Sequence, residues 1–188
     1  FGIAVSMNNT GDRIVVGARY NDGGGSNSGH ARVFDWNGTT WTQVGADING
    51  EAANDLSGTR VSLSSDGSRI AIGAPNNDGN GTDSGHVRIY DYTPSGTTSW
   101  TQLGQDIDGE AAGDWFGDKC SLSANGNILA IAADRNADNG SFSGHVRVYE
   151  WSGSAWTQKG SDIDGEAAED QFGGSVSLSA NGDIMAVG

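Results

Sequence analysis

Apolar and polar residues alternate in short runs along the chain, with the period of two expected for β-strands. Residues 61–64 (Val-Ser-Leu-Ser), 86–90 (His-Val-Arg-Ile-Tyr) and 100–103 (Trp-Thr-Gln-Leu) show this alternation. The run at 70–72 (Ile-Ala-Ile) is apolar throughout, as in a strand covered on both faces. The pattern excludes an array of helices and predicts four short strands in this stretch, with the second near the interior of the ring that such sheets would form.

Turn residues separate the runs. Asp66-Gly67, Asn125-Gly126 and Asn181-Gly182 follow the first run of a set, and such pairs readily take the positive φ angles of a tight hairpin. The third and fourth runs meet at residues 37–38 or 152–153, and residues 94–96 carry a three-residue insertion at the equivalent place. We therefore predict two hairpins per set, the second one exposed.

The set of four runs occurs three times along the chain, and a fourth copy follows in part. His30, His86 and His145 stand 56 and 59 residues apart. A repeat of this length is one supersecondary unit, and four antiparallel strands match one blade of a β-propeller. We predict an all-β fold: an incomplete arc of three four-stranded blades, at residues 1–55, 56–114 and 115–170, plus two strands of a fourth, at 171–188. We also expect a longer parent protein, because a ring needs about four to eight blades. Further blades of that protein, or self-association, would cover the open faces.

Three motifs resemble FG-GAP repeats, the blades of the integrin α-subunit head. They are residues 172–176 (Phe-Gly-Gly-Ser-Val), 72–75 (Ile-Gly-Ala-Pro) and 85–90 (Gly-His-Val-Arg-Ile-Tyr). The match spans the chain, with Ser57 in place of Phe in the second copy. The resemblance implies a propeller in an extracellular or cell-surface protein that serves adhesion or protein binding. It does not carry over the calcium loops of integrins, because the first hairpins here hold too few carboxylates.

Charge and composition limit the partners. The formal net charge is -14, and Lys119 and Lys159 are the lysines. Nucleic acid is excluded as a partner, because its affinity comes largely from cations that meet phosphates. Membrane insertion is excluded as well, since no apolar run approaches the roughly 20 residues of a spanning helix. The single Cys120 stands where other copies have valine, which predicts a small buried hydrophobe.

Carboxylates around a Gly turn form the candidate metal site. The segments that follow the fourth run place side-chain oxygens at steps of two, two and four, and hard cations prefer such oxygen clusters. The prediction is calcium, and otherwise no cofactor; the competing interpretation is a crossover in which Asp and Asn bond their own backbone amides. The candidate ligands are Asp47, Asn49, Glu51, Asp55, Asp106, Asp108, Glu110, Asp114, Asp162, Asp164, Glu166 and Asp170.

The recurring His and Trp residues allow two interpretations. Each His shares a strand face with an Arg two residues on and an aromatic residue four on. This stripe favours packing between blades, with the Arg on a ring or paired to an acid of the next blade. Trp41, Trp100 and Trp156 favour wedges between blades, and stacking on sugars is the alternative.

No catalytic constellation stands out, because His, Trp and the acids recur copy for copy. The loops after strands two and four would share one edge of a four-stranded meander, and we expect binding at this acidic, long-loop face. The function predicted is a non-catalytic surface or secreted segment that binds protein or mediates adhesion; an active site would need further blades. The alternative is a carbohydrate-binding, lectin-type propeller with a glycan ligand.

Overall fold

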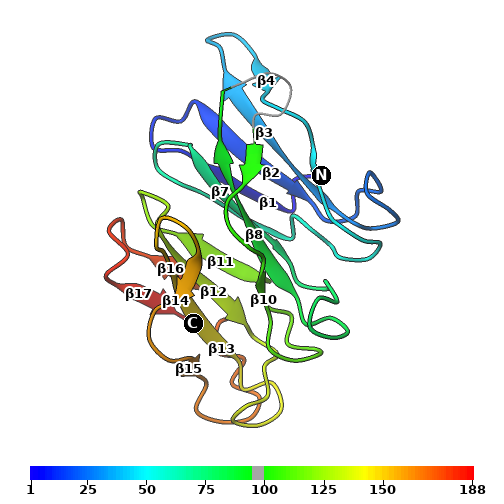
Figure 1. The fold of residues 1–188 in the computed structure, drawn as a ribbon, viewed down its shortest axis with the longest axis vertical. Coiled ribbons are helices and arrows are strands. Elements are labelled where there is room, and N and C mark those ends of the chain that lie inside the picture. Colours follow the sequence, from blue (N-terminus) through cyan, green and yellow to red (C-terminus); the bar gives the residue numbers. More distant parts are fainter. Residues whose placement is uncertain (95–99) are drawn as a thin grey trace.

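The computed structural model describes residues 1–94 and 100–188 as three antiparallel sheets and a fourth sheet of two strands (Figure 1). The first sheet holds β1 (Ala4–Met7), β2 (Arg13–Ala18), β3 (His30–Trp36), β4 (Trp41–Gln43) and β5 (Ile48–Asn49). The second holds β6 (Arg60–Leu63), β7 (Arg69–Ala74), β8 (His86–Tyr92), β9 (Trp100–Gln102) and β10 (Ile107–Asp108). The third holds β11 (Lys119–Leu122), β12 (Ile128–Ala133), β13 (His145–Trp151), β14 (Trp156–Gln158) and β15 (Ile163–Asp164). The last pairs β16 (Val176–Leu178) with β17 (Met185–Val187). Within the described ranges there is no helix, and so none that could cross a membrane.

Each larger sheet is a meander of four strands plus a short fifth. In the third sheet the order is β11-β12-β13-β14, and β15 pairs with the start of β13 while β14 pairs with its end. The prediction of four-stranded antiparallel blades is confirmed, and the fifth strand is an addition to it. A glycine with positive φ lies between the fourth and fifth strands in each copy, at Gly45, Gly104 and Gly160, and interrupts the outer strand there.

Both predicted hairpins are present. Gly67, Gly126 and Gly182 take positive φ between the first two strands, and Gly38 and Gly153 do so between the third and fourth. The predicted insertion at residues 94–96 lies largely outside the described residues.

Adjacent sheets meet along their first strands. The Leu63 amide donates to the Ser6 hydroxyl at 3.0 Å, and the Leu122 amide donates to the Ser62 hydroxyl at 3.0 Å. The same bond joins the third and fourth sheets, from the Leu178 amide to Ser121. The first strands therefore lie side by side, the arrangement of propeller blades around an axis, and the second strands lie one step further out.

The apolar core lies between the sheets. One cluster joins the first two sheets, another joins the second and third, and a third continues to β16 and β17. Ile70 and Ile72 on one face of β7 and Ala71 on the other are almost fully buried, and they belong to two different clusters. The prediction that the second strand is covered on both faces is therefore confirmed. Cys120 is buried in the middle cluster, as predicted, and burial raises the pKa of its thiol to about 12.

The two glycine motifs of neighbouring copies pack on each other. A Cβ added at Gly17 would overlap the carbonyl group of Gly58, and one added at Gly73 would overlap that of Gly117. The second strand of one copy thus packs directly on the backbone of the Gly that opens the next copy. Close backbone approach of this kind requires glycine, which explains the recurrence of both motifs.

Candidate functional site

The long loops gather on one edge of the arc, which we call the long-loop edge. It comprises the loops after the second strands, at residues 19–29, 75–85 and 134–144, and those after the fifth strands, at 50–59, 109–118 and 165–175. Backbone bonds join the two loops of each copy: the Asn54 amide donates to Ser26, the Gly113 amide to Thr82 and the Glu169 amide to Ser141. The tight hairpins lie on the opposite edge (Figure 1). The topological prediction that both long loops share one side is confirmed.

Two of the predicted ligands turn inward. Asp55 and Asp114 are buried. Asp55 accepts the amides of Glu51 and Ala52 at 3.2 and 2.9 Å, and it also accepts the side-chain amide of Asn77 from the next copy at 3.3 Å. In the second copy Asp114 accepts the Ala111 amide at 3.1 Å and the side-chain amide of Asn136 from the next copy at 3.4 Å. These two carboxylates hold the crossover turn and fasten it to the following sheet. Their bonds to backbone amides fit the alternative interpretation of a structural crossover.

Two other acids reach across the gap between sheets. Glu51 lies 3.3 Å from the Arg88 guanidinium, and Glu110 lies 3.3 Å from that of Arg147. Arg88 also donates to the Asn49 carbonyl at 2.8 Å. The pairing between Arg and an acid of a neighbouring blade is thus present. The prediction that this acid comes from the next blade is wrong. It comes from the preceding copy, because the crossover of that copy extends over the following sheet.

The recurring His residues lie next to these acids. His86 Nδ1 is 3.8 Å from an oxygen of Asp106, and His145 Nδ1 is 3.8 Å from an oxygen of Asp162. Burial lowers the pKa of His86 to about 4, with a further contribution from the Arg88 charge; Asp106 acts in the opposite direction. Burial also lowers the pKa of His145. Both imidazoles are therefore neutral at pH 7, the form that can ligate a metal.

The acids of the crossovers are brought together between copies rather than within one. Within residues 1–94 and 100–188, two groups have potential ligand atoms within 4.8 Å of one another: Glu51 with His86 and Asp106, and Glu110 with Asp138, His145 and Asp162. Such groups could hold a metal ion. The remaining predicted ligands lie outside them: Asp47, Asn49, Asp55, Asp108, Asp114, Asp164, Glu166 and Asp170. Asp47 instead forms a two-bond pair with Arg32.

No ligand role was predicted from the sequence for the histidines or for Asp138. The signal for the histidines is the fifth strand, whose pairing places Asp164 opposite His145 and brings Asp162 beside it. A two-residue strand is too short to be recognised from periodicity. Asp138 comes from the other long loop, and only the meeting of the two loops brings it to Asp162 and Glu110.

The fourth-strand tryptophans serve the sheet interfaces. Trp100 Nε1 donates to the Val44 carbonyl of the preceding sheet at 3.1 Å, and Trp156 Nε1 donates to that of Leu103 at 3.1 Å. Trp156 is buried, whereas Trp41 is 40% exposed. The placement of Trp100 and Trp156 fits the interpretation of wedges between blades.

A second set of arginines links adjacent sheets at the edge of the arc that carries the tight hairpins, which we call the hairpin edge. Arg13 forms two bonds with Asp35, at 2.6 and 2.7 Å, and also donates to the Gly67 carbonyl of the next copy. Arg69 repeats these contacts with Asp91 and the Gly126 carbonyl. This link was not predicted from the sequence, although both arginines occupy the same position of the repeat.

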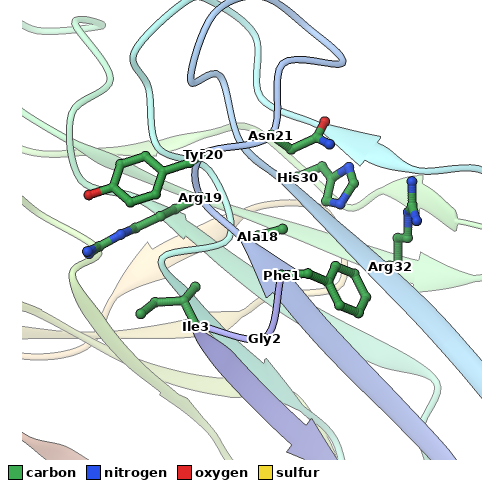
Figure 2. Close-up of a pocket in the computed structure, with 9 residues that line it drawn as sticks. All are labelled: Phe1, Gly2, Ile3, Ala18, Arg19, Tyr20, Asn21, His30 and Arg32. Carbon is green, nitrogen blue, oxygen red and sulfur yellow. The ribbon is translucent and has the colours of Figure 1, made fainter.

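The first sheet carries an open cavity of about 630 Å³ on the face that no other sheet of the described residues covers. Figure 2 shows Phe1, His30 and Arg32 on one side of it, and Arg19 and Tyr20 on the other. The equivalents of Phe1, His30 and Arg32 in the third copy are buried against the second sheet. The cavity therefore has the form of a sheet interface without its second half.

Comparison with known proteins agrees with this architecture. The FG-GAP repeat family matches residues 1–34 and 49–90. No curated protein matches the chain. The chain is similar to the crystal structure of a candidate 6-phosphogluconolactonase from Bacteroides uniformis, with a TM-score of 0.63 and 12% identity. The alignment covers 98% of this chain and 46% of that one, so the chain spans about half of its length. At this identity the likeness concerns the fold alone. The matched repeats and the four-stranded antiparallel sheets together fit an FG-GAP β-propeller, of which this chain forms an unclosed arc.

Proposed function

We propose that the chain is a non-catalytic binding segment of a surface or secreted protein, and that its long-loop edge recognises a positively charged protein surface. The observation that carries the proposal is the gathering of acidic loops on one edge of a rigid stack of sheets. Loops held by a rigid scaffold are the usual carriers of recognition.

The charge of this edge supports a cationic partner. Its exposed acidic side chains come from all three copies: Asp22, Glu51, Asp78, Glu110, Asp138, Glu166, Glu169 and Asp170. Arg19 and Arg135 are the basic residues of the same loops. Arg135 lies over the Trp115 ring at 3.3 Å, and Arg19 lies over the Tyr20 ring at 4.8 Å. A surface with this excess of acids attracts and orients a basic partner.

The loops are also well ordered for recognition. Asp22 accepts the Asn27 amide at 2.7 Å, and Asp78 accepts the Asp83 amide at 2.9 Å. Together with the bonds between the two loops of each copy, these contacts fix the loop shape before a partner binds. A preorganised surface loses less conformational entropy on binding.

The test is a binding assay on purified extracellular-matrix proteins and a glycan array, at 50 and 300 mM NaCl. We expect saturable binding to a protein, weaker by about tenfold at the higher salt concentration because the charges are screened. A variant with Asp22→Asn, Asp78→Asn and Glu169→Gln removes three charges from the edge while both Asn side chains keep their acceptor oxygens. This variant should lose most of the binding.

The matched control removes three charges from elsewhere on the molecule, with Asp66→Asn, Glu150→Gln and Asp183→Asn. Equal binding by the two variants, or binding that ignores salt, would contradict the proposal. Binding to glycans alone, abolished by Trp100→Ala in a folded protein, would support the carbohydrate-binding alternative instead.

Calcium at the crossover carboxylates stays a prediction. At about tenfold excess over a millimolar dissociation constant, each site would add about 1.4 kcal/mol to the free energy of unfolding. Melting curves with calcium and with chelator measure it, and equal midpoints would remove this prediction.

A further inference from the structure

The gap between the second and third sheets holds the densest group of potential ligands. Glu110 follows β10, Asp138 belongs to the loop after β12, His145 begins β13 and Asp162 precedes β15. One nitrogen or oxygen of each lies within 4.8 Å of those of the others. Four segments, one from the second copy and three from the third, therefore converge on a single point.

His145 provides an independent indication of a ligand. Its side chain is fully buried, and neither ring nitrogen has a hydrogen-bond partner among the residues that the structure describes. Its Nδ1 faces Asp162 at 3.8 Å, too far for a hydrogen bond but near enough for a small ion to be shared. Buried polar groups in folded proteins are satisfied with few exceptions, so an imidazole left in this way calls for a partner.

We propose that Glu110, Asp138, His145 and Asp162 form a binding site for a divalent transition cation of the zinc type. Calcium takes oxygen ligands, whereas an imidazole nitrogen with carboxylates suits zinc and its neighbours in the first transition row. Four protein ligands match tetrahedral zinc, and bonds of about 2.1 Å place ligand atoms about 3.4 Å apart. Glu110 and Asp138 are exposed, so these two side chains can move inward to close the site.

The charges around the site are compatible with a cation. The group contains three carboxylates, and one of them, Glu110, has an oxygen 3.3 Å from the Arg147 guanidinium. The second oxygen of Glu110 is left for the ion. The group carries an excess of negative charge even after Arg147 is counted, and a divalent cation would compensate it.

The equivalent gap between the first two sheets is a natural comparison. It contains Glu51, His86 and Asp106, but the position of Asp138 is taken by Gly79. Three ligands hold an ion less firmly than four. The site between the second and third sheets should therefore be the tighter of the two.

The experiment is titration of the chain with Zn²⁺ by calorimetry, and with Co²⁺ by visible absorption. We expect one tight site per chain, and Co²⁺ bands of the intensity that marks tetrahedral coordination. Asp138→Asn should weaken Zn²⁺ at least tenfold, and His145→Gln should remove the tight site. The resonances of the His145 ring should shift on addition of Zn²⁺ in the parent protein.

Asp164→Asn is the control, because it removes an acid of the same segment that lies outside the group. If His145→Gln unfolds, the exposed Asp138→Asn variant still decides the result. Absence of saturable Zn²⁺ binding, or equal affinity in Asp138→Asn and Asp164→Asn, overturns the proposal. Equal binding of calcium and zinc that His145→Gln leaves unchanged overturns it too. The variants of the protein-binding test lie outside this group, so the two proposals fail separately.

Discussion

The same residues of the repeat are buried in one region of the molecule and exposed in another. Phe116 lies between the second and third sheets and is fully buried, with Arg147 4.3 Å above its ring. Phe1 has the same position in the first copy, on the face that no sheet covers, and is 76% exposed. The contrast shows that the motif residues act through the neighbouring sheet. A single repeat cannot bury them.

Removal of the buried ring should have the largest effect. Phe116→Ala should lower the free energy of unfolding by about 3–5 kcal/mol, because it leaves a cavity between two sheets. Phe1→Ala should change it by less than about 0.5 kcal/mol. Urea unfolding of both variants measures the difference. Similar losses in the two would mean that the interface does not depend on this ring.

The close approach of the backbones at the same interface should give the next largest effect. Gly73→Ala places a Cβ against the carbonyl of Gly117, so the two sheets must separate. We expect a loss of about 1–3 kcal/mol in the free energy of unfolding. Gly174→Ala is the control, since its Cβ would meet nothing nearer than 3.4 Å and its φ is not positive. Equal melting midpoints for the two variants would contradict this account of the paired glycines.

The fold could be predicted from the sequence because its determinants are periodic and local. Alternation, the Asn-Gly and Asp-Gly turns and the spacing of the copies predict the strands, hairpins and sheets directly. The fifth strand was missed because two residues such as Ile163 and Asp164 carry no periodicity. The fifth strand forms because the outer strand is interrupted by a glycine and then pairs with the start of the third strand.

The candidate site was harder to predict, because its members come from different copies. The spacing of Asp106, Asp108, Glu110 and Asp114 indicates one loop with four ligands. In the structure Asp114 turns inward to its own backbone, while Glu110 reaches the next sheet. The sequence pattern finds the acidic residues, but only the packing of adjacent sheets decides which of them meet.

The arginine link on the hairpin edge should have a smaller effect. Arg69→Met removes two bonds to Asp91 and one to the Gly126 carbonyl, and we expect a loss of about 1–2 kcal/mol. Lys159→Met removes an exposed pair with Glu150 and should cost about 0–0.5 kcal/mol. Urea unfolding compares the two. The third copy has Ile128 at the position of Arg69, so a stable Arg69→Met variant would mean that apolar packing alone can hold this edge.

The histidines should give the smallest effect, through pH. The folded-state pKa of His86, about 4, lies below its ordinary value near 6.5, so the unfolded chain binds a proton first as the pH falls. The contribution of this residue to stability is therefore present above about pH 6.5 and is lost as the pH falls toward 4, by about 0.8 kcal/mol at pH 6. The Arg88 charge further lowers the pKa of His86 and the Asp106 charge raises it, so neither residue is substituted in this experiment. Urea unfolding from pH 7.5 to 4.5, with chelator present, records the slope, and His86→Gln should flatten it. An unchanged slope in that variant would mean that His86 takes up its proton without disturbing the interface, and that the interface tolerates the charge.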